Sequence, residues 1–217
     1  MNEILELKNI MKYFLVKKNF REMFYLTERQ YIKAVDDVSF TIGKGRVFVL
    51  AGGSGSGKTT LARLILRAIE PDGGSIIFDG EDITRNTDNK LRKFRTNVQM
   101  IHQDPFTSLN PRMKIMDIVM EPLNIHNKQI SKCERREKVF RSLENVRLEP
   151  VGDIAEKFPH MLSGGQRQRV ALARSLVLKP KLVIADEPVS NLDVSVRAEI
   201  LDLMKNLKFY RLDGLDL

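Results

Sequence analysis

One eight-residue segment, at positions 52–59, limits what this chain can fold into more than any other. It reads GGSGSGKT and lies between an apolar run, Arg46–Ala51, and an amphipathic helical pattern. Glycines let backbone N–H groups converge on phosphate oxygens, and the N-terminus of the following helix adds partial positive charge. The alternative is a glycine-rich turn with a solvated lysine. The strand and helix flanks favour a loop that binds nucleotide phosphates.

Each position of this loop has an expected role. We expect the Lys58 ammonium group to lie between the β- and γ-phosphates and the Thr59 hydroxyl to coordinate Mg²⁺. The other positions expected to contact the nucleotide are Gly52, Gly53, Ser54, Gly55, Ser56, Gly57 and Thr60.

Two acidic residues, Asp186 and Glu187, follow a second apolar run, Lys181–Ala185. An apolar strand that ends in acids places carboxylates at the carboxyl edge of a sheet. We expect Asp186 to hold the Mg²⁺ shell and Glu187 to orient or deprotonate a water that attacks the γ-phosphate. A strand that meets solvent through acidic residues is the alternative, and the phosphate loop favours the catalytic interpretation.

The segment LSGGQRQR, residues 162–169, predicts a helix that Ser163 caps and whose apolar face includes Val170, Ala173 and Val177. A capped helix behind two glycines is a second anion-binding geometry, which is redundant for one nucleotide in one chain. A symmetric pair of chains removes the redundancy, because each capped helix completes the other chain's site.

LSGGQ, with the phosphate loop before it and the Asp-Glu pair after it, resembles the ATP-binding subunit of ABC transporters over residues 4–207. The resemblance implies an α/β fold: a P-loop NTPase core with a mostly parallel sheet, an N-terminal antiparallel β subdomain and a helical insertion. It implies an ATP-binding core of residues 1–103 and 176–217 and a helical subdomain, 104–175, that carries the signature motif. Strands that alternate with helices in the sequence favour the same class.

The resemblance also implies cofactors and further site residues. ATP and Mg²⁺ are the expected cofactors. Gln103 matches the glutamine that senses the γ-phosphate and Mg²⁺, and Asp193 matches the loop that crosses the dimer interface. Phe14, or alternatively Tyr13, is expected to stack on adenine. The signature residues expected to contact nucleotide are Ser163, Gly164, Gly165 and Gln166.

Three segments resemble the dipeptide/oligopeptide (or nickel) importer branch: KAVDDVSF at 33–40, QDPFTSLNPRM at 103–113 and DEPVS at 186–190. This branch implies that ATP hydrolysis drives import of peptides or similar small solutes. The expected partners are transmembrane permease subunits, a second ATP-binding subunit and, indirectly, a solute-binding protein. The expected location is the cytoplasmic face of the cell membrane, reached through those partners.

Composition excludes several classes of protein. The apolar runs are far shorter than the roughly 20 residues of a membrane span, and the single cysteine, Cys133, excludes an internal disulfide. The net charge of +8 raises the possibility of a nucleic-acid partner. ABC-type ATPases that act on nucleic acid carry coiled-coil inserts or tandem cassettes, and neither is present, so we expect no nucleic-acid partner.

The end of the chain departs from the family. A family histidine on a further strand contacts the γ-phosphate, but His102, His126 and His160 all precede Glu187, and residues 208–217 no longer resemble the family. We therefore expect the last core strand to be missing. The alternative function is a truncated ATP-binding module with little or no turnover.

Periodicity predicts the remaining elements. Residues 15–33 read as a polar, basic loop or hairpin insertion, and a helix after the phosphate loop carries Leu61, Leu64, Ile65, Ala68 and Ile69 on one face. Strands are expected at 3–10, Val35–Ile42, Arg46–Ala51, Ser75–Phe78, Val98–Ile101 and Lys181–Ala185, and helices through 104–175 and near the end.

Overall fold

The computed structural model describes residues 3–16, 30–101, 109–127, 129–190 and 192–212, with side chains through Lys205. The chain divides into two compact units, Met1–Leu91 and Arg92–Leu217, and each is described by itself. The domain division expected above, 1–103 with 176–217 and 104–175, stays a prediction.

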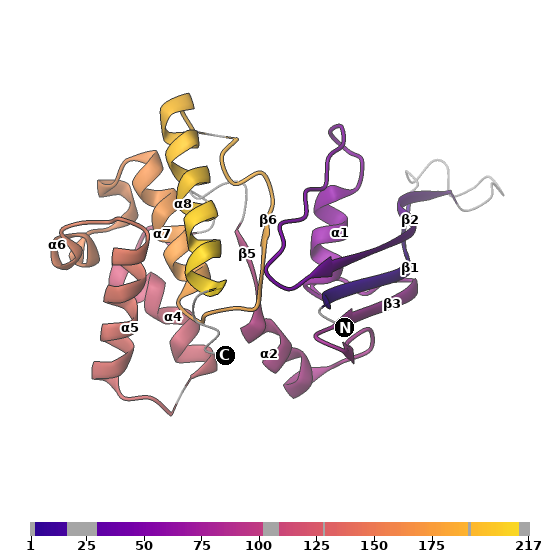
Figure 1. Cartoon of the computed structure of the whole chain (residues 1–217), viewed down its shortest axis with the longest axis horizontal. Coiled ribbons are helices and arrows are strands. Elements are labelled where there is room, and N and C mark those ends of the chain that lie inside the picture. The colour runs from indigo at the N-terminus through magenta and orange to yellow at the C-terminus, as the bar shows by residue number, and fades with distance from the viewer. Residues whose placement is uncertain (1–2, 17–29, 102–108, 128, 191, 213–217) are drawn as a thin grey trace, which may run out of the picture. The chain divides into compact units, whose positions relative to one another are not determined.

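The first unit is built on a four-stranded antiparallel sheet with the strand order β2-β1-β3-β4 (Figure 1). The expected N-terminal antiparallel β subdomain is therefore present. Its strands are β1 (Glu3–Leu15), β2 (Tyr31–Gly43), β3 (Gly73–Phe78) and β4 (Glu81–Asp82).

The long β1 strand supplies much of this unit's core, since Leu5, Leu7 and Ile10 are buried. The strand predicted at residues 3–10 is confirmed, and it continues to Leu15. Of the loop or hairpin insertion expected at 15–33, residues 31–33 pair with the end of β1 in an antiparallel arrangement as the start of β2, which agrees with a hairpin. Residues 17–29 lie outside the described part of the chain.

Helix α1 (Lys58–Ile65) follows the phosphate loop and is shorter than predicted. Leu64 and Ile65 are buried as expected, but Ala68 and Ile69 lie beyond the end of the helix. The helix ends because Arg67 adopts a positive φ of 52°. The Arg67 Nε donates to the carbonyl of Ile83 over 3.1 Å, and this bond is buried.

The strand predicted at Arg46–Ala51 is wrong. These residues form neither helix nor strand, and the exposed fractions of Val47, Phe48, Val49 and Leu50 are 69%, 46%, 78% and 43%. The Phe48 ring stacks on Phe40 with centroids 4.6 Å apart. A strand needs a neighbour for its backbone N–H and C=O groups, and none of the four strands of this unit's described sheet pairs with the segment. An apolar run alone therefore did not specify a strand.

The second unit contains a parallel pair of strands, β5 (Val98–Ile101) and β6 (Leu182–Ala185), as predicted. Val98 pairs with Leu182 and Ile101 with Ala185. Helix α2 (Asp88–Asn97) runs into β5 across the boundary between the units. The other helices are α4 (Ile115–His126), α5 (Lys132–Asn145), α6 (Val151–Glu156), α7 (Gly164–Leu176) and α8 (Val194–Leu212), with a 3₁₀ turn, η2 (Pro159–Met161).

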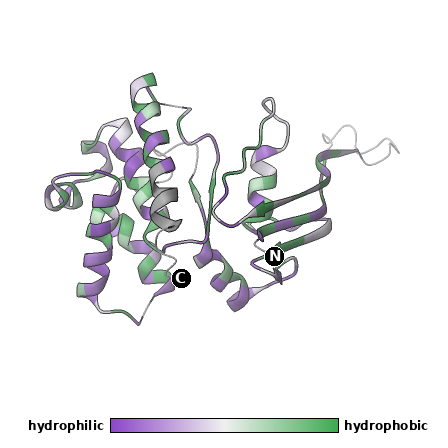
Figure 2. Cartoon of the chain, in the orientation of Figure 1, coloured by the Kyte–Doolittle hydropathy of each residue, from purple (hydrophilic) through white to green (hydrophobic). Residues whose placement is uncertain are grey.

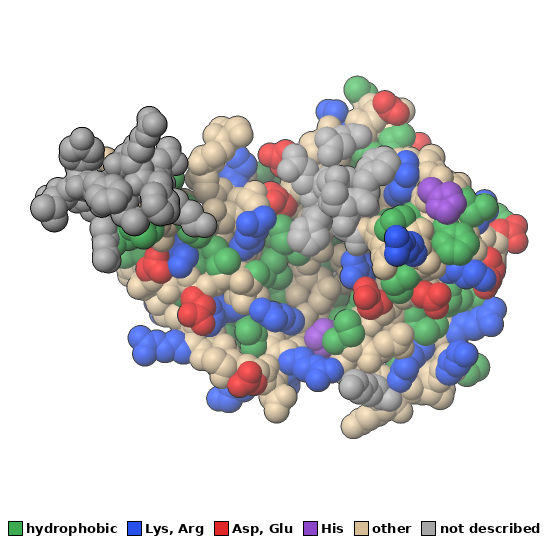
Figure 3. Space-filling view, turned by 180° about the vertical axis from the view of Figure 1, so that it is seen from behind, with side chains coloured by type: hydrophobic (Ala, Val, Ile, Leu, Met, Phe, Trp, Pro, Cys, Tyr) green, Lys and Arg blue, Asp and Glu red, His purple; other side chains and the backbone are tan. Residues whose placement is uncertain are grey.

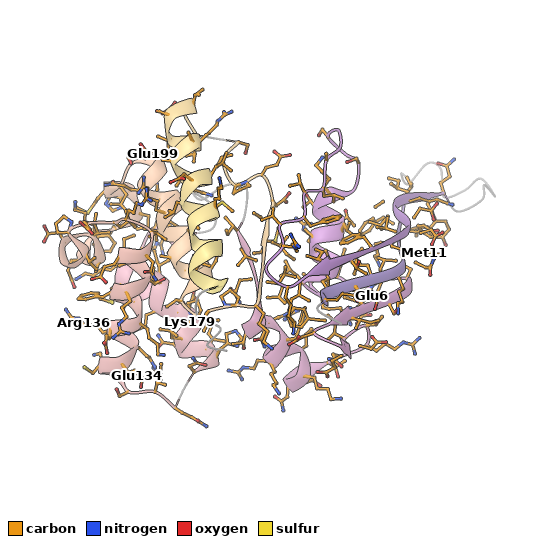
Figure 4. The ribbon with its side chains drawn as sticks, viewed as in Figure 1. Glu6, Met11, Glu134, Arg136, Lys179 and Glu199 are labelled. Atoms are coloured by element: carbon orange, nitrogen blue, oxygen red, sulfur yellow. The ribbon has the colours of Figure 1, made fainter. Side chains whose placement is uncertain are left out.

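One apolar cluster joins these helices. Its fully buried members include Val119 of α4, Leu143 of α5, Val170 of α7 and Ile200 of α8. Figure 2 shows hydrophobic and hydrophilic residues alternating along each of these helices, as expected of helices that bury one face. At the surface, Arg169 of α7 pairs with Glu199 of α8 over 2.7 Å (Glu199 is labelled in Figure 4).

Lys and Arg side chains on the face in Figure 3 lie among acidic and apolar ones. Across the described ranges, no helix has the length and apolar content that a bilayer crossing requires.

A pair of valine substitutions tests the placement of the 47–50 segment. Val35 is 5% exposed and Val49 is 78% exposed. We expect Val35→Ala to lower the free energy of unfolding by about 2 kcal/mol, because two buried methyl groups are lost. Val49→Ala should change it by less than about 0.5 kcal/mol. Urea denaturation measures both, and equal losses would show that Val49 is buried after all.

Candidate functional site

The phosphate loop in the first unit has the backbone geometry that its glycines predicted. Gly55 and Gly57 have positive φ values of 79° and 89°, a region in which L side chains are disfavoured. A Cβ atom at Gly57 would lie 2.1 Å from the carbonyl oxygen of Ala34. Only glycine therefore allows the loop to approach β2 this closely and turn into α1.

The Lys58 ammonium group lies within the curve of this loop. Its Nζ is 2.7 Å from the carbonyl oxygens of both Gly52 and Gly53 and 3.4 Å from the Ser56 Oγ. A lysine tail has three donors and no acceptor, so the loop holds it by oxygen atoms alone. The group is thereby placed where anionic oxygens that enter the loop would meet a positive charge.

The start of α1 adds further donors. Its N-cap is Gly57, which has no side chain to cap the helix, and the first turn contains no acidic residue. The N–H groups of Lys58, Thr59 and Thr60 precede the first intrahelical bond, from Leu61 N–H to the Gly57 carbonyl at 2.8 Å. The N–H groups of a helix's first turn and the helix dipole together favour an anion. Thr59 is exposed in this turn.

The two acidic residues expected at the end of β6 are found there, in the second unit. The Asp186 N–H donates to the Ile101 carbonyl over 3.1 Å, which extends the parallel ladder by one residue. Glu187 is exposed and has a positive φ of 46°. Ser190 closes the turn that follows, because its N–H and its Oγ both donate to the Glu187 carbonyl, over 3.2 Å and 3.1 Å.

The signature segment begins α7 with the predicted serine cap. The Ser163 Oγ accepts from the Gln166 N–H over 3.2 Å, and the Gln166 side chain accepts from the Ser163 N–H over 3.0 Å. This reciprocal capping box fixes the first turn. A Cβ atom at Gly165 would lie 2.7 Å from a methyl group of Val196, so glycine lets the start of α8 approach closely. A Cβ atom at Gly164 would lie 3.7 Å from a methyl group of Leu192, an ordinary van der Waals distance, so this position does not require glycine.

Asp193 follows Leu192 and is exposed. Arg197 of α8 holds the loop before it: its Nε donates to the Leu192 carbonyl over 2.6 Å and its Nη2 to the Ser190 carbonyl over 3.0 Å. The second unit thus brings together the signature glycines, the Glu187 turn and the Asp193 loop. The phosphate loop belongs to the other unit, and Gln103 lies outside the described residues.

Tyr13 and Phe14 differ in how many contacts each makes with its neighbours. The Tyr13 hydroxyl donates to Asp36, Lys33 Nζ lies 5.4 Å from the ring centroid, and Asp72 accepts from the Tyr13 N–H over 2.7 Å. The hydrogen bond to Asp36 raises the pKa of Tyr13. The same bond, followed by that from Lys33, lowers the pKa of Asp36.

Phe14 is 41% exposed, and Lys12 Nζ lies 5.7 Å from its ring centroid. Phe14 therefore keeps more open ring surface than Tyr13 does, and it is the better candidate for stacking on a base.

Two side chains in the second unit were missed by sequence reasoning. Gln168 and Arg197 both bond to backbone carbonyls of the loop after β6. Gln168 carried a usable signal: it is spaced from Leu172 and Ser175 by four and seven residues, so it lies on the buried face of α7. Arg197 carried none, since its partners are backbone atoms that the sequence pattern does not mark.

Comparison with known proteins places these motifs in a family. A family model described as "ABC transporter" matches residues 35–190. The oligopeptide transport ATP-binding protein AppF of Bacillus subtilis is 46% identical over 208 residues, which cover 94% of this chain and 60% of AppF. OppF of the same organism is 44% identical, with 95% and 64% covered. The chain thus spans about 60% of the length of these curated relatives.

Solved structures give the same result for the fold. The dimeric structure of MJ0796, titled as a bacterial ABC transporter cassette, has a TM-score of 0.79 and 30% identity, with 96% of this chain and 84% of that chain covered. A dimeric post-hydrolysis state of MJ0796 bound to ADP and Pi has a TM-score of 0.78 at 30% identity, with 94% and 83% covered. With its phosphate loop, capped signature helix and acidic strand end, the chain belongs to the ABC transporter family and has its P-loop NTPase fold.

Proposed function

We propose that the chain binds ATP with Mg²⁺ and hydrolyses it to drive import of peptides or similar small solutes. The observation that best supports nucleotide binding is the position of the Lys58 ammonium group. The carbonyls of Gly52 and Gly53 hold this group at the start of a helix that has no side-chain cap. The relatives named for oligopeptide transport support the solute class.

The phosphate loop would bind the triphosphate. When the nucleotide binds, the three donors of Lys58 can turn from backbone carbonyls to phosphate oxygens, and the first N–H groups of α1 add neutral donors beside them. Residues 52–57 precede α1, and Thr59 and Thr60 lie in its first turn. Glycine is required by geometry at Gly55 and Gly57, since side chains at these two positions would be strained.

Thr59, Asp186 and Gln103 are the residues that would hold Mg²⁺, which neutralises developing charge on phosphate oxygens. Within the described ranges, no three His, Cys, Asp or Glu side chains gather as a metal site. Mg²⁺ needs no such cluster, because it keeps several waters and uses one or two protein oxygens beside the nucleotide. Thr59 is exposed and Asp186 is half-buried, and a hydroxyl and a carboxylate supply the oxygen ligands that suit that chemistry.

Glu187 would act as the general base. Its exposed position in the turn after β6 gives the carboxylate access to a water molecule. Ser163 to Gln166 would bind the nucleotide of a second ATP-binding subunit, and Asp193 would lie at the interface between the two. The dimeric MJ0796 structures support this arrangement. The further proposed partners are the permease subunits, at the cytoplasmic face of the membrane, and a solute-binding protein that acts through them.

Removing the lysine charge tests nucleotide binding. Lys58→Ala should weaken MgATP binding about 10- to 100-fold, because charge-assisted hydrogen bonds to phosphate are lost. Isothermal titration calorimetry measures the dissociation constant. Lys44→Ala is the matched control, since Lys44 lies in the same unit and pairs only with Asp79, over 2.7 Å, among the ion pairs described. Unchanged affinity in Lys58→Ala would contradict the proposal.

Removing the carboxylate tests hydrolysis. We expect Glu187→Gln to lower kcat about 10²- to 10⁴-fold and to leave the affinity for MgATP unchanged, since only the proton acceptor is lost. Phosphate release measures kcat. Glu156→Gln serves as the control, because Glu156 is exposed and pairs with Lys114 over 2.7 Å. If the unsubstituted chain binds ATP but releases no phosphate, the alternative of an ATP-binding module without turnover is correct.

The two aromatic residues can be distinguished by the base. Phe14→Ala should weaken ATP binding about 5- to 100-fold through lost stacking and leave binding of inorganic tripolyphosphate unchanged, because that ligand has no base. Tyr13→Phe keeps the ring and loses the hydroxyl bond to Asp36, and it should bind ATP normally. Competition against a fluorescent nucleotide measures the affinity of each variant for ATP and for tripolyphosphate. A larger loss of ATP affinity in Tyr13→Ala than in Phe14→Ala would assign stacking to Tyr13.

A further inference from the structure

A glutamine is buried without full hydrogen bonding on the helix that carries the signature motif. Gln168 of α7 has 0% of its surface exposed. Its Nε2 lies 2.6 Å from the carbonyl oxygen of Pro188. Its Oε1 is also buried and has no hydrogen-bond partner among the described residues. The Pro188 carbonyl can only accept, so the amide nitrogen is the atom that must face it.

Stability alone does not explain this residue. A buried polar atom without a partner costs free energy that an apolar side chain of the same size avoids. Leucine or methionine at position 168 would fill the same space beside Val170 and Leu172, which are buried. The one thing an apolar residue would lose is the bond to the Pro188 carbonyl.

Pro188 lies in the turn that carries Glu187. Glu187 holds a positive φ of 46°, which is unfavourable for a residue other than glycine. The Ser190 N–H and Oγ close the turn onto the Glu187 carbonyl. Gln168 is bonded to the backbone between these two residues. Arg197 bonds to the Ser190 and Leu192 carbonyls, so the segment is held at its middle by α7 and at its far end by α8.

We infer that Gln168 is a positioning residue for Glu187: its amide holds the Glu187–Ser190 turn against the signature helix and so sets where the Glu187 carboxylate lies. This inference rests on the proposed role of Glu187 in ATP hydrolysis. Gln168 itself need not touch the nucleotide, because it acts through the backbone of Pro188.

Gln168→Met is the test, because methionine has a similar length and lacks the donor. The expected result is a kcat about tenfold lower with a dissociation constant for MgATP within twofold of normal, since orientation of the base is lost and the phosphate loop is not touched. Amide hydrogen exchange followed by NMR should also quicken about tenfold at Ser190, whose N–H closes the turn. Gln168→Leu is a second variant in case the methionine variant does not fold.

Ser142→Ala is the matched control. Ser142 is buried at 5% exposure, and its Oγ donates to the Ala173 carbonyl over 2.8 Å, so it too holds α7 by one side-chain bond to a backbone oxygen. It should leave kcat and exchange at Ser190 unchanged. Normal exchange at Ser190 in Gln168→Met, or an equal rise in both variants, would overturn the inference. Exchange needs no turnover, so absence of ATPase activity in the unsubstituted chain would refute the proposed hydrolysis separately.

Discussion

The close approach of backbone to backbone at Gly57 is the constraint on which the phosphate site depends. A side chain there would lie 2.1 Å from the Ala34 carbonyl, so the loop could not rest on β2 and α1 would not begin at Lys58. Gly165 repeats the principle at the start of α7, against Val196. In both places a missing Cβ lets another element approach the first turn of a helix, and the turn's backbone is thereby fixed in position.

The two helix starts differ in whether a side chain caps them. Helix α1 has glycine at its N-cap position and therefore no side-chain cap there. In helix α7, the Gln166 N–H donates to the Ser163 hydroxyl and the Ser163 N–H donates to the Gln166 side chain. The first start therefore suits a fully charged polyphosphate chain. The start of α7 uses part of its N–H donors in the capping box, which also fixes the turn. This suits a contact that completes the nucleotide site of another subunit rather than a site that binds the whole triphosphate.

Short sequence patterns predicted the serine cap of α7, the strands β5 and β6 and the acids after Ala185. The pairing of β5 with β6 is not local, because it joins Val98 to Leu182. The strand at Arg46–Ala51 was predicted wrongly because hydrophobicity reports that a segment avoids water and does not identify a pairing partner. Arg197 was missed for a related reason: its partners are the carbonyls of Leu192 and Ser190, and backbone oxygens carry no sequence signal.

The backbone of Glu187 contributes to the proposed site separately from its carboxylate. Glu187 is exposed and has a positive φ of 46°. The direction in which its side chain leaves the backbone depends on this conformation and on the hydrogen bonds that hold the turn. Those bonds come from Ser190 within the turn and from Gln168 and Arg197 on two helices. A shift of either helix would therefore move the turn and change the orientation of the proposed base. The position of α7 thus bears on Glu187 even though the signature residues of α7 are assigned to the nucleotide of a second subunit.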